Sequence, residues 1–254
     1  MVGASVAGLF LLLFLGVVGA LRAGEPLASF DHRVVAFIQS DRDPWLNQLM
    51  GFFTDLCSWQ IVVGGTAALV IYLAVVRRWL WMTTLLVSVI GDQIIVSTLK
   101  NLFGRARPDQ TIALVPATGG SFPSGHTFAA LAFYGLIAVW AVATTRSGWA
   151  KPLIVIVALA GIFTVGVSRV YLGAHWPSDV LGSFTLGAAS VSAVMTGAFA
   201  FAARRPARSV APRPNRLLAA GLLIAWLGLV GGFTYLHPVP HATEAVEAPE
   251  YEFP

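Results

Sequence analysis

Charged side chains are scarce in this chain: aspartate, glutamate, lysine and arginine together make up 11% of its 254 residues. An average soluble domain carries about 25%. This shortage excludes a protein whose whole surface faces water, and a hydrophobic content of 57% indicates lipid as the surrounding medium. We therefore predict an integral membrane protein.

Cysteine and clustered metal ligands are also scarce. Cys57 is the only cysteine, so no disulfide can form within the chain. No group of histidine and cysteine has zinc spacing, and carboxylates near the candidate catalytic stretches are too sparse for a magnesium or two-metal site. We expect no metal and no cofactor. The basic residues lie mainly in short links and form no separate groove-lining face, so we expect no nucleic-acid partner.

Long apolar runs are what the chain has instead. A helix that crosses the hydrocarbon core needs about 20 mainly apolar residues. Seven such runs are predicted as spans: 4–22, 58–76, 79–99, 126–145, 152–170, 179–202 and 217–236. The first run has no basic residue ahead of it and is long for a signal peptide, so we predict an uncleaved span. The predicted fold is an all-α, polytopic membrane helical bundle.

Basic residues in the links between spans predict the orientation. These links hold Arg77, Arg78, Arg146, Lys151, Arg204, Arg205, Arg208, Arg213 and Arg216. Because cytoplasmic loops are enriched in lysine and arginine, we expect these links inside. Segments 23–57, 100–125 and 168–179 then face the exterior, and a bacterial cytoplasmic membrane fits the size and topology.

The predicted organisation follows from these runs. Residues 1–202 form a membrane core that includes an interfacial amphipathic helix, with Leu27, Phe30, Val34, Phe37 and Ile38 at helical spacing. Residues 203–216 form a basic cytoplasmic linker and residues 217–236 an additional transmembrane helix. Residues 237–254 are proline-rich and acidic, which predicts a disordered tail.

A group of cations follows the third predicted span, in the stretch KNLFGRARP. Lys100, Arg105 and Arg107 have one nearby carboxylate, Asp109. Cations this close repel one another unless solvent screens them or an anion joins them. Alternatively, these cations are ordinary basic residues that flank the membrane, although the positive-inside rule disfavours such a group on the outer face.

The stretch SFPSGHT introduces the fourth predicted span. Ser124 and Gly125 place free backbone amides at the start of a helix, where anions bind, and Ser124 adds a hydroxyl donor. His126 follows directly. Taken alone, His126 is equally compatible with a capping or packed histidine.

The stretch SRVYLGAHWPSD lies between the fifth and sixth predicted spans. Pro177 suits the first turn of a helix, which places His175 just before it and Asp179 within it. A carboxylate four residues on can hold one imidazole nitrogen and leave the other free as a base or nucleophile. A His–Asp pair that merely caps the helix is the alternative.

Together the three stretches supply the parts of phosphoryl transfer. Arg169 joins Lys100 and Arg107 as a cation, and the two histidines can serve as nucleophile and acid on the same side of the membrane. Inside the third span, Asp92 lies two turns from Lys100, and intramembrane acids are costly. A structural hydrogen bond is slightly favoured for Asp92 over a role in substrate binding.

The three stretches resemble the motifs of the type 2 phosphatidic acid phosphatase family, which comprises integral-membrane lipid phosphatases with a core of six spans. Its fold is shared by vanadium haloperoxidases and bacterial acid phosphatases. The resemblance covers about residues 25–202 and leaves the seventh span and the acidic tail outside.

The resemblance implies roles for individual residues. His175 would attack phosphorus, Asp179 would orient it, and His126 would protonate the leaving oxygen and later activate water. Lys100, Arg107, Ser124, Gly125 and Arg169 would hold the phosphate. Arg105 lies outside the motif and is a possible auxiliary residue, as is Asp92.

The resulting hypothesis is a lipid phosphatase that acts on the outer face. Its substrate would be a polyprenyl diphosphate, such as undecaprenyl diphosphate, or a glycerolipid phosphate, such as phosphatidate or phosphatidylglycerophosphate. Expected partners are this lipid and the surrounding membrane. Transfer of the phosphoryl group to a lipid or sugar acceptor is an alternative, and a channel or lipid transporter that only binds headgroups is a weaker one. Haloperoxidase activity is disfavoured in so lipid-embedded a chain.

Overall fold

The computed structural model describes residues 2–40, 42–204 and 216–239, and within these ranges the regular structure is helical. The elements are α1 (Val2–Ala23), α2 (Leu27–Gln39), α3 (Pro44–Asp55), α4 (Trp59–Val75), α5 (Trp79–Phe103), α6 (Gly125–Ala130), the π-helix η1 (Leu131–Gly135), α7 (Leu136–Thr144), α8 (Ala150–Tyr171), α9 (Pro177–Ala203) and α10 (Arg216–Leu236). The prediction of an all-α membrane bundle is confirmed. Most of the predicted linker 203–216 and of the predicted tail 237–254 lies outside the described residues.

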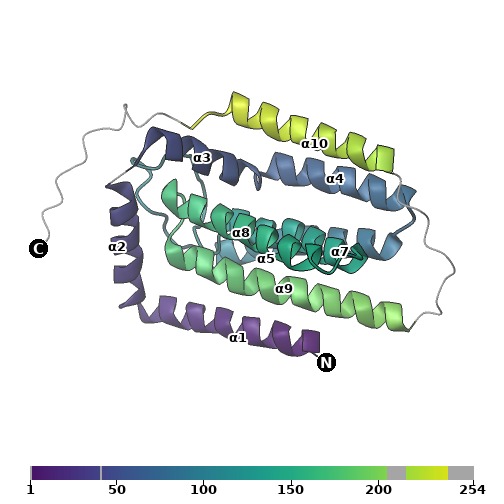
Figure 1. Ribbon diagram of the computed structural model, residues 1–254. Coiled ribbons are helices and arrows are strands. Elements are labelled where there is room, and N and C mark those ends of the chain that lie inside the picture. Colours follow the sequence, from purple (N-terminus) through teal and green to yellow (C-terminus); the bar gives the residue numbers. More distant parts are fainter. Residues whose placement is uncertain (1, 41, 205–215, 240–254) are drawn as a thin grey trace, which may run out of the picture.

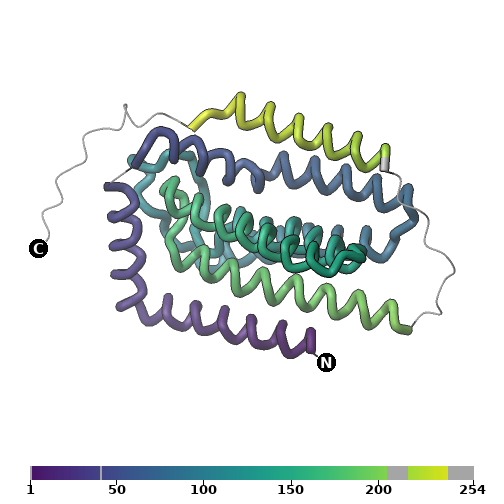
Figure 2. The backbone as a smooth tube through the Cα atoms, in the orientation of Figure 1, coloured from purple at the N-terminus to yellow at the C-terminus, as the bar shows by residue number. Residues whose placement is uncertain are grey.

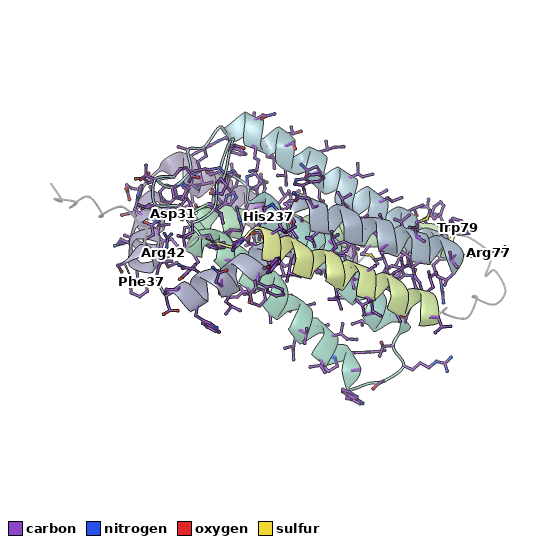
Figure 3. The ribbon with its side chains drawn as sticks, turned by 90° about the horizontal axis from the view of Figure 1, so that it is seen from above. Asp31, Phe37, Arg42, Arg77, Trp79 and His237 are labelled. Atoms are coloured by element: carbon purple, nitrogen blue, oxygen red, sulfur yellow. The ribbon has the colours of Figure 1, made fainter. Side chains whose placement is uncertain are left out.

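The long helices run side by side, and α2 lies across one end of them (Figure 1). Helix α1 packs along α9, while α10 packs on α4 and α3. The path of the chain places α2 at one end of the bundle and the link 76–78 at the other (Figure 2). Figure 3 shows Asp31, Phe37 and Arg42 at one end and Arg77 and Trp79 at the opposite end.

Six helices are long and apolar enough to cross a membrane, and α3 and α4 together could form a seventh span that is bent by 44°. A helix forms at the predicted second span 58–76: α4 has 17 residues, and the sequence analysis did not predict that α3 precedes it across the bend. At the bend, the Asp55 carbonyl accepts from both the hydroxyl and the backbone amide of Ser58, at 2.8 and 2.9 Å.

Helix α5 is longer than the predicted span 79–99. It ends at Phe103, and the next residue, Gly104, adopts the left-handed conformation (φ 53°) that glycine tolerates at a helix end. Lys100 consequently lies in the last helical turn, and not in the loop where the sequence predicts it. The fourth span is likewise not one regular helix, because the π turn of η1 separates α6 from α7.

Helix α2 forms where the sequence predicts an amphipathic helix, but its inward side is partly polar. Asp31 and Val35 are buried, whereas the predicted apolar residues Phe30 and Phe37 are 48% and 79% exposed. Phe37 points away from the bundle (Figure 3). The buried carboxylate of Asp31 is a feature that the apolar spacing does not predict.

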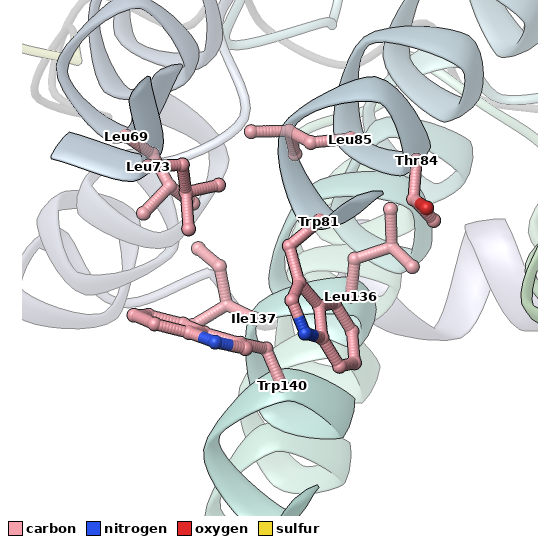
Figure 4. A pocket seen from close by; sticks show the side chains of 8 residues that line it. All are labelled: Leu69, Leu73, Trp81, Thr84, Leu85, Leu136, Ile137 and Trp140. Carbon is pink, nitrogen blue, oxygen red and sulfur yellow. The ribbon is translucent and has the colours of Figure 1, made fainter. Parts of the chain in front are cut away.

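The end with Arg77 and Trp79 is closed by apolar side chains. Trp81 and Trp140 face each other there with leucines around them (Figure 4), and the Trp140 ring also packs edge-on against Tyr72. The gap between them has a volume of about 10 Å³, enough for one water molecule at most. This end holds a packed apolar core, so the polar chemistry is concentrated at the other end.

The last helix is attached to the bundle by specific contacts. The Trp226 indole donates to the Ile61 carbonyl on α4 at 3.3 Å, and the Gln48 side chain of α3 donates to the Val239 carbonyl at 2.6 Å. Val239 is buried. Helix α10 is therefore held to α3 and α4 both within its length and just after its end.

Candidate active site

The three polar stretches meet at the end of the bundle that α2 covers. The loop 104–124 and the turn 172–176 are joined by a hydrogen bond of 2.9 Å from the Trp176 indole to the Ala106 carbonyl. The same loop reaches the start of α6, and the turn leads into α9. Segments far apart in the sequence thus form one site.

His175 and Asp179 lie next to each other and are both buried. Nδ1 of His175 is 3.4 Å from Oδ2 of Asp179, which is within ion-pair distance but longer than a normal hydrogen bond. The same carboxylate oxygen accepts from the Trp176 amide at 2.9 Å, and Pro177 begins the helix. These contacts orient the Asp179 carboxylate toward the ring of His175.

The other ring nitrogen of His175 faces a cation. Nε2 lies 3.3 Å from the NH1 group of Arg107. Burial lowers the pKa of His175 well below its ordinary value of 6.5, and repulsion from Arg169, Arg107 and Lys100 lowers it further, while a backbone hydrogen bond with Ser121 acts in the opposite direction. The unliganded site therefore holds a neutral imidazole.

Lys100 and Arg107 converge on backbone carbonyls. Both donate to the Gly120 carbonyl, Lys100 at 2.9 Å and Arg107 at 3.2 Å. Arg107 also donates to the carbonyls of Thr118 and Ala174, at 2.9 and 2.6 Å. Within the described residues neither cation has a carboxylate at ion-pair distance. In the part of the chain that the structure describes, their positive charges thus have no ion-pair partner.

Arg169 is a third cation of this kind. It is 5% exposed, its NH1 group donates to the Thr54 hydroxyl at 2.5 Å, and its Nε has no hydrogen-bond partner among the described residues. The Arg169 carbonyl accepts from the amides of Ala174 and His175. Arg169 therefore both adds charge and shapes the turn that carries His175.

The start of α6 lies beside these cations. Ser124 is buried and accepts a hydrogen bond from the Thr127 hydroxyl at 3.0 Å. At Gly125, an added Cβ would come within 4.0 Å of the Lys100 side chain. His126 is half-buried and close enough to His175 for their charges to interact. The predicted site residues of all three stretches are thus brought together.

The two possible auxiliary residues have other partners. Arg105 pairs with Asp31 at 2.7 Å and with Oδ1 of Asp179 at 2.5 Å, whereas His175 faces Oδ2 of Asp179. Asp92 accepts a hydrogen bond from Ser190 at 2.6 Å, which ties α5 to α9, and a longer one from Ser88 of its own helix at 3.4 Å. Sequence reasoning missed Asp31, because a carboxylate in an amphipathic helix usually faces water.

A cleft of about 700 Å³ leads away from the site along α5. Lys100, Gly125 and His126 line one part of it, and Ala129 and Gln93 line others. Most of the remaining lining is apolar and comes from α4, α5 and the α6–η1 segment. Its volume suits a lipid-sized ligand.

No group of three or more histidine, cysteine or carboxylate side chains that could hold a metal ion occurs in the part of the chain that the structure describes. Metal independence of the chemistry stays a prediction.

Comparison with known proteins agrees with this geometry. The family model of the PAP2 superfamily matches residues 81–203, which include all three motif stretches. The chain is 33% identical over 186 residues to phosphatidylglycerophosphatase B of Bacillus subtilis, an alignment that covers 70% of this chain and 87% of that protein. It is 29% identical to an undecaprenyl-diphosphatase of Sulfolobus acidocaldarius, over 70% of this chain and 84% of that protein.

Among solved structures, the fold is similar to a crystal structure of a transmembrane PAP2-type phosphatidylglycerolphosphate phosphatase from Bacillus subtilis. The TM-score is 0.68 at 29% sequence identity, and the match covers 80% of this chain and 99% of that chain. Part of this chain therefore has no counterpart in that structure.

Proposed function

The chain belongs to the PAP2 superfamily of phosphatases, and we propose that it hydrolyses the phosphate headgroup of a membrane lipid through a phosphohistidine on His175. One observation carries this proposal. Lys100, Arg107 and Arg169 gather around His175. Within the described residues, none of these three cations has a carboxylate at ion-pair distance. A dianionic phosphate would supply the missing negative charge, and cations fixed in advance stabilise the charge of the transition state.

In the first half of the reaction, the lone pair on Nε2 of His175 attacks phosphorus. A nitrogen–phosphorus bond forms as the bond from phosphorus to the lipid oxygen breaks. His126 gives its proton to that leaving oxygen, and Asp179 stabilises the positive charge that develops on the ring of His175. The three cations and the Ser124 hydroxyl bind the phosphoryl oxygens.

In the second half, a water molecule attacks the phosphohistidine. His126, now neutral, takes a proton from this water, and the nitrogen–phosphorus bond breaks to release inorganic phosphate. The resting states of both histidines are restored. His126 suits this double role because it lines the cleft beside Lys100 and Gly125, where the leaving group would depart.

The lining of the cleft favours a glycerolipid phosphate over a polyprenyl diphosphate. Ser97 and Gln93 lie about 4.5 and about 10 Å deeper along α5 than Lys100, and both are exposed in the cleft. A glycerolipid carries ester oxygens within a few bonds of its phosphate, and the Gln93 amide can donate to them. The Gln93 amide nitrogen already donates to the Ser97 hydroxyl at 3.3 Å, but a polyprenyl chain offers no acceptor for its second N–H at that depth, where an unpaired donor is costly.

We place the site on the outer face of a bacterial cytoplasmic membrane. The basic links that hold Arg77, Arg78 and Arg146 lie at the end opposite the site, and cytoplasmic ends are enriched in such residues.

A phosphate-release panel tests the proposal. Purified protein in detergent is assayed with phosphatidylglycerophosphate, phosphatidate and undecaprenyl diphosphate, with and without a chelator. We expect release in both conditions and acid-labile label on the wild-type protein but not on His175→Ala. Full activity of His175→Ala would refute the nucleophile, and label passed to an added lipid or sugar acceptor would indicate a phosphotransferase.

A second measurement tests the substrate class. Gln93→Leu removes the amide but keeps the bulk. We expect kcat/KM for phosphatidylglycerophosphate to fall about three- to tenfold, the value of one net hydrogen bond, and that for undecaprenyl diphosphate to stay unchanged. Equal effects on both lipids would contradict the glycerolipid preference.

A further inference from the structure

Arg105 bridges two buried carboxylates that come from different parts of the chain. Its NH1 group is 2.5 Å from Oδ1 of Asp179, and its NH2 group is 2.7 Å from Oδ2 of Asp31. The side chains of Asp31 and Asp179 are 1% and 0% exposed, and that of Arg105 is 21% exposed. Little solvent is present to screen the charges of this network.

Asp31 is also bonded to the first turn of α9. It accepts from the Ser178 amide at 2.9 Å and from the Ser178 hydroxyl, and this hydroxyl accepts from Arg105 at 2.8 Å. The Trp176 ring packs against the Arg105 guanidinium at 5.7 Å. Helix α2 is thereby fixed to the turn that carries His175 and Asp179.

The charges of this network determine what His175 faces. With one arginine and two carboxylates, the network carries a net charge of −1. Without Asp31, the positive charge of Arg105 would cancel that of Asp179, at 2.5 Å, and the net charge would be zero. Asp179 could then give little stabilisation to a positive charge on His175.

We propose that Asp31 is a positioning residue that acts through Arg105. It neutralises the guanidinium, so that Asp179 keeps its negative charge for the imidazole ring as Nε2 bonds to phosphorus. This inference rests on the proposed phosphohistidine at His175. It assigns to α2 an electrostatic role in the site that it covers.

The test uses variants that change charge but keep shape. Asp31→Asn keeps one oxygen that can accept from the Ser178 amide, while its NH2 group replaces the oxygen that faces Arg105 and the Ser178 hydroxyl, and the variant leaves the positive charge of Arg105 to Asp179 alone. We expect kcat to fall about 10- to 100-fold, as for other outer partners of functional histidines, with KM nearly unchanged. Asp43→Asn is the matched control: Asp43 is an exposed carboxylate that caps α3, and asparagine can cap equally well, so kcat should not change.

The double variant Asp31→Asn/Arg105→Gln separates charge from structure. It removes both opposite charges and returns the net charge to −1, so we expect kcat several-fold above that of Asp31→Asn. A merely structural role for Asp31 predicts that the double variant is no faster than the single one. That result, or full kcat in Asp31→Asn, would overturn the proposal.

Folding is monitored by size-exclusion elution and thermal melting of each variant. If Asp31→Asn does not fold, Arg105→Gln is compared with the double variant, and the two should have nearly equal kcat because Asp31 has no guanidinium left to neutralise. Failure of both Asp31 variants to fold would assign Asp31 to folding and overturn the inference. A wild-type protein that forms no phosphoenzyme would instead overturn the proposed function itself.

Discussion

Lys100 and Arg107 donate hydrogen bonds to the same carbonyl oxygen, that of Gly120, at 2.9 and 3.2 Å. One lies at the end of α5 and the other in the loop that follows, so the carbonyl fixes the spacing of the two cations. A neutral acceptor holds them without cancelling their charge. An anion that binds between them therefore meets two donors that are already in place.

Gly120→Ala should disrupt this arrangement. A Cβ at this position would lie 2.7 Å from the Lys100 backbone oxygen, and a helix backbone cannot easily move aside. We expect at least tenfold weaker inhibition by vanadate, a phosphate analogue, because the two cations are forced apart. Gly148→Ala is the control, since its Cβ would enter open space. Equal inhibition of both variants would contradict the role of the Gly120 carbonyl.

In a plot of kcat/KM against pH, the decline on the acid side (the acid limb) should lie below pH 6.5. Neutral His175 is the form that attacks, and burial and nearby cations lower its pKa well below 6.5. Because kcat/KM reports the free enzyme, the loss that a proton on His175 causes should appear only below pH 6.5. In the unfolded chain His175 has its ordinary pKa and therefore binds this proton at a higher pH than in the folded protein. The free energy of unfolding should consequently decline as pH falls below 6.5. An acid limb above pH 7 would contradict this assignment.

Removal of one cation should move the acid limb. Arg107 lies 3.3 Å from Nε2 of His175 and disfavours a positive ring. In Arg107→Gln the pKa of His175 should rise toward its ordinary value, so kcat/KM should begin to fall at higher pH than in the wild type. The overall rate also drops, because a phosphate-binding group is lost. An acid limb that stays in place while the rate drops would show that Arg107 does not act on His175.

Thr54→Val should weaken the site from a distance. The Thr54 hydroxyl is the acceptor that holds buried Arg169, at 2.5 Å, and valine has the same shape without the oxygen. An unpaired buried donor costs about 1–3 kcal/mol, so we expect a lower melting temperature and a several-fold higher KM. Thr144→Val serves as control, because the Thr144 hydroxyl bonds only carbonyls of its own helix. Similar losses in both variants would argue against a specific role of Thr54.

A bulky side chain in the cleft should affect long-chain substrates selectively. Ala129 lines the cleft one helical turn beyond His126. Ala129→Trp should reduce activity on phosphatidylglycerophosphate about tenfold or more, because the tail can no longer enter, and leave that on soluble p-nitrophenyl phosphate nearly unchanged. Ile156→Trp, on an exposed position of α8, should change neither. Parallel losses on both substrates would mean that Ala129→Trp damages the site itself.

The family and the helical membrane fold could be predicted from the sequence, because both depend on local signals. Apolar runs of about 20 residues identify the spans, and three motifs in a set order identify the PAP2 superfamily. The sequence also predicted that Lys100, His126 and His175 lie close together, because phosphoryl transfer requires the three motifs to meet at one site. The roles of these residues stay predictions.

Other features depend on contacts between distant segments and could not be predicted. The bond between Asp31 and Ser178 joins residues 147 positions apart, and no periodicity in α2 distinguishes a buried carboxylate from a solvated one. The bend between α3 and α4 was missed because 58–76 is apolar enough to be read as a span of its own. The extension of α5 through Lys100 depended on the left-handed turn at Gly104.

The π turn of η1 separates two parts of one span that face different surroundings. His126 precedes it and faces the polar end, while Trp140 follows it and packs in the apolar core. A π turn accommodates one residue more than an α-helical turn. If the same residues formed a regular α-helix, the two parts would be turned by about 100° relative to each other, so the π turn sets the rotational register between His126 and the apolar core.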